Sequence, residues 1–446
     1  MQTIAQAVAD LEAGRTTARK LVERCLERIE DPAGEGPVTF VKVYGEQARA
    51  SADAMDALRQ VNRAPGPLAG IPISFKDLLD VAGERTAAGS RVLAEAKPAT
   101  RHAVVAQRCL AAGLVPTGRT NMTEFAFSGI GINPHFGTPR SPWKRDEGHI
   151  PGGSSSGAAV SVADGMALAA LGTDTGGSCR IPAAFCGVVG YKPTQSRVPN
   201  TGVLPLSPSL DSVGPLANSV ACCAAIDAVL AGEPLARLKP MELRGLRLAV
   251  PGNYVMAGME PAVTEAFSRA LNRLSNLGVR ITHLTFPQFE QIDEANKSGG
   301  FAAAEAHTWH REYLADQGEI YDPRVRVRIQ RGESMTAGDM VRLHEARRKI
   351  IGSMNEATAP FDAVAMPTCP IVPPRIDQLG DDADYARVNA LALRNTALGN
   401  FLDRCAISLP AHRPGEAPVG FMLMGETGGD ARLFAIAAAI EPILKE

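Results

Sequence analysis

The chain has 446 residues, of which 45% are hydrophobic and 21% charged, a balance that excludes disorder as its main state. Its 46 basic and 48 acidic side chains give a net charge of −2, which excludes a strongly basic nucleic-acid-binding protein and offers no electrostatic attraction to a membrane. The eight cysteines form no CxxC pair and show no zinc-ligand spacing, so buried free thiols are expected rather than disulfides or a metal site.

No apolar segment near the start of the chain has the character of a secretory signal, and no run reaches the ~18 apolar residues of a membrane span. A cytoplasmic protein is therefore expected. Apolar spacing predicts these elements in the first half: helices on either side of Gly14, the second capped by Thr16 or Thr17, a helix over 45–61, a strand over Ile71–Phe75, a helix over 103–112, a strand over Leu114–Thr117, loops over 129–153, and a buried helix within Gly157–Gly172.

The second half of the chain continues this alternation of strands and helices. The pattern predicts a strand over Leu246–Val250, a helix over 260–277, a strand over Val279–Thr285, a mostly helical segment over 300–357, and a strand over Ala363–Met366. Strands and helices that alternate along the whole chain indicate the α/β class.

One short motif suggests a nucleophilic serine. Residues Gly153–Gly157 match GxSxG with Ser155 at the centre, as around the nucleophile of α/β-hydrolases, and histidines later in the chain keep that interpretation open. The preceding residues, Gly148–Gly152, do not form the strand that such a turn requires.

Two other short motifs are interpreted as coincidental. Ser141 and Lys144 match SxxK, but Pro142 disfavours the helix that would align their side chains. His307 and His310 have a spacing that metal ions can use, but no third ligand lies near them in the sequence. A solvated helix face is expected there.

A longer pattern is far more specific. It comprises Gly70–Asp77 (GIPISFKD), Gly152–Gly157 (GGSSSG) and Leu171–Thr194 (LGTDTGGSCRIPAAFCGVVGYKPT). Together these segments resemble the amidase signature family of serine hydrolases, which use a Ser–cis-Ser–Lys triad. The resemblance extends over most of the chain and includes Ser209–Pro215, Met366–Thr368 and Pro418–Gly420.

Lys76 is the candidate base. A serine hydroxyl is a weak nucleophile until a base takes its proton. Lys76 follows the buried strand Ile71–Phe75, and desolvation there would lower the pKa of its amine enough to accept a proton at neutral pH. The alternative is an ordinary salt bridge with Asp77 or another carboxylate, but the serine motifs favour the base.

The family resemblance implies a role for each of two serines. Ser178 is expected to be the nucleophile that forms the acyl-enzyme, and Ser154 is expected to relay protons between Ser178 and Lys76. The family holds the peptide bond before the bridging serine in the cis form. Gly153 precedes it here, and glycine adds the least steric hindrance to such a bond.

The turn that leads to Ser178 is expected to bind the negative oxygen of the tetrahedral intermediate. Consecutive main-chain N–H groups with two glycines among them can converge on one point. The predicted donors belong to Thr175, Gly176, Gly177 and Ser178.

Side chains around this turn are expected to support it. Asp174 and Arg180 flank the turn with opposite charges, so an ion pair that holds it is predicted. Ser155 and Ser156 are expected to form hydrogen bonds with the local backbone, as most polar side chains do.

Two segments are expected to contact the substrate. Residues 121–128 align with a family segment that lines the pocket near the scissile bond, which suggests contacts from Ala126, through its carbonyl, and from Phe127. Core packing is the alternative for Phe127. In the proline-rich segment after the last predicted strand, Cys369 and Ile371 are expected to form an apolar wall.

The resemblance implies a single large α/β/α domain with a mixed, twisted central sheet flanked by helices. Within it, residues 1–64 are expected to pack as helices on the core, 65–220 to form the signature core, and 221–446 to complete the sheet and the substrate pocket.

The implied activity is hydrolysis of a carboxylic amide C–N bond in a small molecule, by acylation and deacylation, without a metal or cofactor. The family also includes enzymes that act on carbamates and esters, and homodimers are common in it. One alternative is a glutamine amidotransferase subunit that supplies ammonia to a partner. Another is a non-catalytic scaffold of the same fold, which the presence of all three triad residues disfavours.

Overall fold

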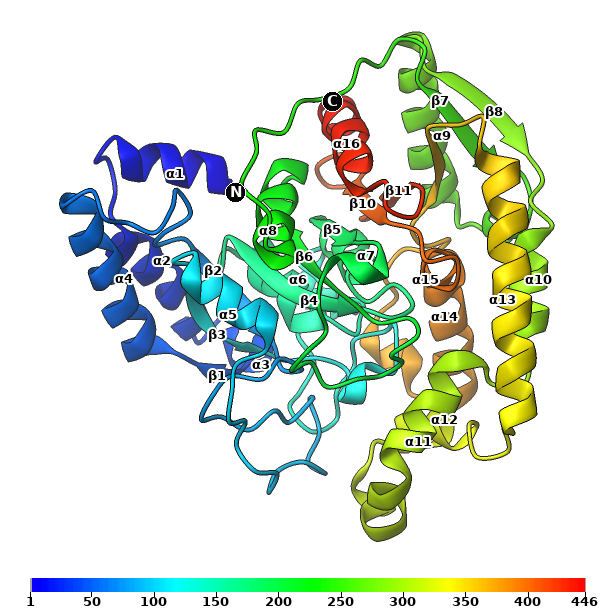
Figure 1. The fold of residues 1–446 in the computed structure, drawn as a ribbon, viewed down its shortest axis with the longest axis horizontal. Helices are drawn as coiled ribbons and strands as arrows, with labels where there is room; N and C mark the ends of the chain where they lie inside the picture. Colours follow the sequence, from blue (N-terminus) through cyan, green and yellow to red (C-terminus); the bar gives the residue numbers. More distant parts are fainter. Residues whose placement is uncertain (1, 446) are drawn as a thin grey trace.

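The structure is a computed structural model that describes residues 2–445. Its centre is a mixed sheet of eleven strands. In spatial order the strands are β1 (Phe40–Val43), β3 (Val115–Thr120), β2 (Pro72–Lys76), β4 (Ala169–Asp174), β6 (Ser212–Ala217), β5 (Val189–Lys192), β10 (Ala406–Pro410), β11 (Gly420–Met424), β9 (Ala363–Pro367), β7 (Arg247–Pro251) and β8 (Arg280–Leu284) (Figure 1). β2 is parallel to β3 and β4, and β7 is parallel to β8 and β9. The other pairings are antiparallel.

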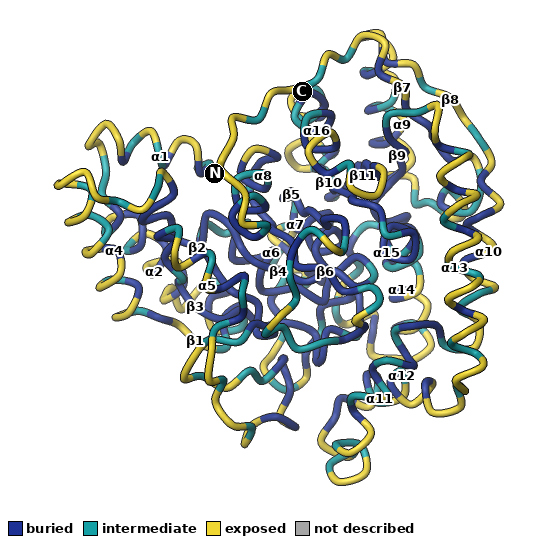
Figure 2. The backbone as a smooth tube through the Cα atoms, in the orientation of Figure 1, coloured by how far each residue is buried: buried dark blue, intermediate teal, exposed yellow. Residues whose placement is uncertain are grey.

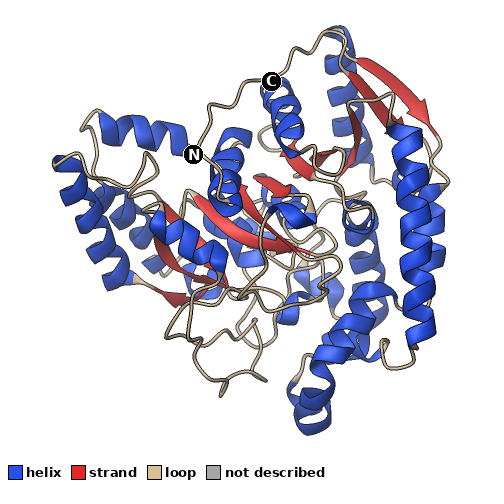
Figure 3. Ribbon diagram, viewed as in Figure 1, coloured by secondary structure: helices blue, strands red, loops and turns tan. Residues whose placement is uncertain are grey.

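Helices cover both faces of this sheet (Figure 3). The first face packs against α1 (Ile4–Glu12), α5 (Val104–Ala111), α8 (Val220–Ala231), α9 (Pro261–Asn276) and α16 (Asp430–Lys445). The second packs against α6 (Ser156–Ala163), α7 (Arg180–Cys186), α10 (Gln288–Asn296), α13 (Ala337–Thr358) and α15 (Ala397–Phe401). The architecture is therefore the α/β/α arrangement expected from the sequence.

The remaining helices lie around this sandwich. α2 (Ala18–Glu30) and α4 (Gly45–Gln60) pack beside β3 at one end of the sheet, and α3 (Gly36–Thr39) precedes β1. α11 (Gly300–Gln317) and α12 (Pro323–Gln330) pack against each other near the lower edge in Figure 1, and α14 (Asp382–Arg394) lies above them and packs against α15.

The alternation of side chains along one strand shows how the two layers form. In β9, Ala363 and Ala365 join the apolar cluster under α9 and α16, whereas Val364 and Met366 join the cluster under α10 and α13. Successive residues of a strand point to opposite faces, so a strand that is apolar at every position is buried on both. Figure 2 shows the central strands buried, and the edge strand β8 and the outer sides of α10 and α13 exposed.

The small, apolar segment 157–172 differs from its predicted single helix. α6 ends at Ala163, Asp164 caps it, and Gly165 adopts a φ of +70° before the chain enters β4. A run of small apolar residues has no periodicity that distinguishes a buried helix from a buried strand. The prediction was therefore wrong for the second half of this segment.

Besides β4, five strands were not predicted: β1, β5, β6, β10 and β11. β1 adds the segment before residue 65 to the edge of the sheet by pairing with β3, so this segment is not helical throughout. The predicted helices over 45–61, 103–112 and 260–277 are present as α4, α5 and α9, and Thr17 caps α2. No helix within residues 2–445 is both long and apolar enough to cross a membrane.

A tight contact between β5 and α7 yields a test of the fold. A Cβ atom on Gly190 would lie 2.3 Å from the carbonyl oxygen of Cys179 and 2.6 Å from the Cβ of Ala183. We expect Gly190→Ala to lower the free energy of unfolding by about 1–3 kcal/mol, because the helix must move off the strand. Urea denaturation measures this change.

The matched control is Gly352→Ala on the exposed side of α13, where nothing lies within 4 Å of the new Cβ. This substitution should increase stability by about 1 kcal/mol, because alanine is the better helix former. Equal stability of the Gly190→Ala variant and the natural protein would contradict the packing described here.

Candidate active site

Lys76 is the last residue of β2, and its side chain is fully buried. Its Nζ donates hydrogen bonds to Ser154 Oγ and to Thr173 Oγ1, each at 2.7 Å. It forms no ion pair with the described residues, because the neighbouring Asp77 pairs instead with Arg119 at 2.7 Å. The salt-bridge interpretation of Lys76 is therefore wrong. Burial lowers the pKa of Lys76 to about 7, so a large part of this amine is uncharged at neutral pH.

Ser154 lies in the loop before α6, and the peptide bond between Gly153 and Ser154 is cis. The next residue, Ser155, donates its hydroxyl to the carbonyl oxygen of Thr173 at 3.2 Å, and its main-chain N–H donates to the carbonyl oxygen of Ser178 at 3.3 Å. This second bond connects the two serine segments. Ser155 is buried and no strand precedes it, so the structure provides no nucleophile elbow at the GxSxG motif.

Ser178 lies in the turn between β4 and α7 and borders a cavity of about 530 Å³. Thr175 and Gly176 border the same cavity, whereas Lys76 and Ser154 are not among its lining residues. Of the three predicted triad residues, Ser178 is therefore the one that a ligand in the cavity can reach, whereas Lys76 and Ser154 are fully buried.

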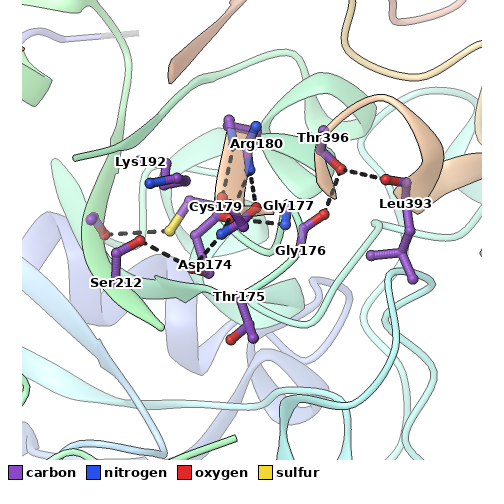
Figure 4. Close-up of polar contacts among 12 residues, drawn as sticks. Asp174, Thr175, Gly176, Gly177, Cys179, Arg180, Lys192, Ser212, Leu393 and Thr396 are labelled. Carbon is purple, nitrogen blue, oxygen red and sulfur yellow. Dashed lines mark hydrogen bonds and ion pairs between the residues drawn. The ribbon is translucent and has the colours of Figure 1, made fainter. Parts of the chain in front are cut away.

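Asp174 holds the turn in place (Figure 4). Its carboxylate accepts hydrogen bonds from the main-chain N–H groups of Gly177 (2.9 Å) and Cys179 (3.1 Å), and it forms the expected ion pair with Arg180 at 2.8 Å. Burial acts to raise the pKa of Asp174, but the Arg180 guanidinium outweighs it and the pKa is held at about 2. Asn400 adds a hydrogen bond at 3.0 Å.

The structure removes Gly177 from the predicted donors to the negative oxygen of the intermediate. Because the N–H of Gly177 donates to Asp174, the candidate donors are those of Thr175, Gly176 and Ser178. Thr396 Oγ1 donates to the carbonyl oxygen of Gly176 at 2.6 Å, which fixes the orientation of that part of the turn (Figure 4).

Several residues of the site were not identified from the sequence. Thr173 contacts Lys76, Asp211 accepts a 2.5 Å hydrogen bond from Thr175 Oγ1, and Thr396 and Asn400 reach the turn from beyond α14. Thr173 and Asp211 lie inside the matched segments Leu171–Thr194 and Ser209–Pro215, so the motifs contain a signal for them. The other two lie outside every quoted motif.

The predicted substrate contacts divide into two groups. Ala126 and Phe127 line the cavity beside Ser178. Cys369 and Ile371 do not, because both are buried in an apolar cluster that includes Phe185. The prediction for these two residues was wrong: the sequence showed that they are apolar but not which side of the loop faces the cavity.

The HxxH motif on α11 was also interpreted incorrectly. His310 is fully buried rather than solvated, its Nδ1 lies 2.9 Å from the hydroxyl of Tyr321, and its ring packs against Phe125. Burial lowers the pKa of His310 to about 3, so the ring is neutral. No group of three or more His, Cys, Asp or Glu side chains in residues 2–445 is arranged to hold a metal ion.

Comparison with known proteins identifies the family. The family model described as Amidase matches residues 20–434. This chain belongs to the amidase family. The amidase is 36% identical over 450 residues to 2-amino-5-chloromuconic acid deaminase from Comamonas testosteroni, covering 99% of the chain and 96% of the relative. It is 33% identical to a glutamyl-tRNA(Gln) amidotransferase subunit from Chromohalobacter salexigens, covering 98% and 95%.

Solved structures agree with this assignment. A crystal structure of an amidase superposes on this amidase with a TM-score of 0.90 at 31% identity, covering 99% of both chains. A peptide amidase in complex with the competitive inhibitor chymostatin gives a TM-score of 0.83 at 26% identity, covering 99% of this chain and 97% of the other. The protein is an enzyme that hydrolyses the C–N bond of an amide.

The ion pair of Asp174 predicts how stability depends on pH. We expect Asp174→Asn to lower the free energy of unfolding by about 3–5 kcal/mol near pH 7, because Arg180 then remains buried without a carboxylate partner. The folded-state pKa of Asp174, about 2, lies below the unfolded value of about 3.9. The stabilisation is therefore present above about pH 4 and is lost as the pH falls from about 4 to 2.

Urea denaturation of both proteins between pH 7 and pH 3 measures this difference. The matched control is Asp316→Asn, at an exposed position of α11, which should change stability little at any pH. A difference between Asp174→Asn and the natural protein that stays constant below pH 4 would contradict the assignment.

Proposed function

We propose that this amidase works through a Ser–cis-Ser–Lys triad made of Ser178, Ser154 and Lys76. The observation that carries the proposal is the contact between the buried Nζ of Lys76 and Ser154 Oγ, at 2.7 Å and without a competing carboxylate. An amine with a pKa of about 7 can accept a proton from a hydroxyl and return it within one catalytic cycle.

In the acylation half, Ser178 Oγ attacks the amide carbonyl carbon. Its proton passes to Ser154 Oγ, whose own proton passes to Lys76 Nζ. The carbonyl oxygen becomes negative and accepts hydrogen bonds from the N–H groups of Thr175, Gly176 and Ser178. The C–N bond then breaks while Lys76 returns the proton through Ser154 to the leaving nitrogen, which departs as ammonia or an amine.

In the deacylation half, water attacks the ester that links the acyl group to Ser178. Lys76 and Ser154 take the proton of the water and return it to Ser178 Oγ, which releases the acid and restores the enzyme. The three side chains supply every proton transfer that the cycle needs, and the N–H groups of the turn stabilise the negative oxygen of each tetrahedral intermediate.

The proposed substrates are small carboxylic amides that fit the cavity of about 530 Å³. Carbamates and esters have a carbonyl group that Ser178 could attack in the same way, so we propose them as further substrates.

All eight cysteines are free and buried, which supports a reducing, cytoplasmic location. We also propose that the enzyme forms a homodimer, as is common in the family, and sedimentation velocity of the purified protein would measure its molecular mass in solution.

Substitution of the serines tests the nucleophile. Ser178→Ala should lower kcat by at least about 1000-fold and prevent labelling by a fluorophosphonate probe, because alanine has no hydroxyl to attack the amide carbonyl or the phosphorus of the probe. Ser155→Ala removes only a hydrogen bond to the carbonyl oxygen of Thr173 and should retain activity within about tenfold. Peptide mass spectrometry locates the label, and a label on Ser155 would favour the GxSxG interpretation instead.

The pH profile tests the base. Only the neutral amine of Lys76 accepts a proton, so kcat/KM should rise with pH and level off above an inflection near pH 7. Lys76→Ala should lower the rate by orders of magnitude and remove that inflection. A profile of the natural enzyme that is flat from pH 5 to pH 9 would refute the role of Lys76.

A second candidate function is that of a component that supplies ammonia to a partner enzyme. It is favoured by the 33% identity to the glutamyl-tRNA(Gln) amidotransferase subunit, whose name marks it as part of a larger assembly. The purified chain decides between the two. Release of ammonia or amines from simple amides by the chain alone supports the independent amidase, and release from glutamine only after a partner is added supports the ammonia-supplying component.

A further inference from the structure

The charges that line the cavity are unbalanced. Three of its lining residues are arginines, Arg328, Arg331 and Arg394, and Asp293 is the single acidic residue among them. The other lining residues are uncharged, and most are apolar. An excess of positive charge inside a largely apolar cavity lowers the energy of an anionic ligand there.

Two other arginines of α12, which do not line the cavity, each form an ion pair with a carboxylate. Arg324 forms an ion pair with Asp382 at 2.7 Å, and Arg326 forms one with Glu319 at 2.5 Å. Each therefore has a carboxylate partner within the chain.

The two arginines of the same segment that line the cavity differ. Neither Arg328 nor Arg331 forms an ion pair with the residues that the structure describes. Arg328 donates one hydrogen bond, from Nη1 to the carbonyl oxygen of Phe127 at 2.8 Å, which fixes it beside the substrate-contact segment. Burial lowers the pKa of Arg328, and the nearby positive charge of Arg331 adds to this effect, whereas Tyr385 and Asp322 act in the opposite direction without forming an ion pair with it. Two like charges at i and i+3 repel each other, so their arrangement costs stability unless an anion lies between them.

Asp293 does not compensate these two arginines. It accepts a hydrogen bond from the hydroxyl of Tyr254 at 2.7 Å, and the guanidinium of Arg394 lies over the Tyr254 ring at 5.9 Å from its centroid. Arg394 also donates to the carbonyl oxygen of Val255 at 3.0 Å. Asp293, Tyr254 and Arg394 thus satisfy one another, and the positive charge of α12 remains.

We propose that Arg328 and Arg331 form a subsite for a carboxylate group of the substrate, so that the preferred amides carry a carboxylate remote from the scissile C–N bond. This inference rests on the proposed function, because Ser178 borders the same cavity. The planar fork of a guanidinium matches the two oxygens of a carboxylate, and charged hydrogen bonds of this kind are among the strongest in proteins. The apolar residues between the two ends suit the hydrocarbon part of such a molecule.

Matched substrates test the subsite. Adipamate carries a terminal carboxylate, and hexanamide has the same chain length with a methyl group in its place. The natural enzyme should have a higher kcat/KM for adipamate than for hexanamide. Arg328→Gln should reduce the ratio of the two values by about 10–100-fold, mainly through a higher KM for adipamate, because the ion pair forms when the substrate binds.

Arg326→Gln is the matched control: the same substitution on the same helix, at an arginine that pairs with Glu319 outside the cavity. It should keep the ratio of the natural enzyme. Arg331→Gln, at an exposed position, is the second variant if Arg328→Gln does not fold, and it should lower the ratio in the same direction.

The outcomes separate the subsite from the proposed function. Equal hydrolysis of adipamate and hexanamide by the natural enzyme, with loss of both in Ser178→Ala, would overturn the subsite and leave the nucleophile in place. If neither amide is hydrolysed, calorimetric titration with adipamate and hexanamide themselves decides the subsite alone. Tighter binding of adipamate that Arg328→Gln or Arg331→Gln weakens supports it, and equal binding of the two amides overturns it.

Discussion

The site depends on an amine that is buried without a carboxylate. Removing a charged ammonium from water is costly, so a lysine in this position is held partly neutral rather than paired. The sheet causes this burial, because β2 lies between two parallel strands, β3 and β4, and Lys76 at its end is fully buried. Its hydrogen-bond partners are two hydroxyl groups, which leave its charge uncompensated and its proton available for transfer.

A second buried charge is treated in the opposite way, and the contrast explains the division of roles. Asp174 is as deeply buried as Lys76, but a guanidinium, two main-chain N–H groups and an amide surround it, so it stays ionised. A fully satisfied polar network is rigid, and here it fixes the turn that leads to Ser178. One buried charge is thus used for structure, and the other is left free to change its protonation state.

The site also combines distant parts of the chain. The three side chains of the proposed triad come from the first half, whereas Thr396 and Asn400 brace the turn from the second half, and α10, α11 and α14 supply much of the cavity wall. Catalytic groups can therefore stay constant while the helices of the second half vary the charge and shape of the pocket. Arg328 and Arg331, at the end of α12, are an example of such variation: they form no ion pair within residues 2–445 and lie outside the motifs that identify the family.

The sequence by itself determined the α/β class, the family and several helices, because these depend on local periodicity and on long motifs, and it predicted Lys76, Ser154 and Ser178 as the candidate triad. It did not determine β10 and β11, the strand half of 157–172, the burial of His310 or the direction in which Ile371 faces. Each of these is decided by contacts between segments far apart in the chain, where a buried strand, a buried helix and a pocket wall share the same apolar composition. For the same reason only the tertiary structure shows that the amine of Lys76 lacks a carboxylate and that Gly177 already donates its N–H to Asp174.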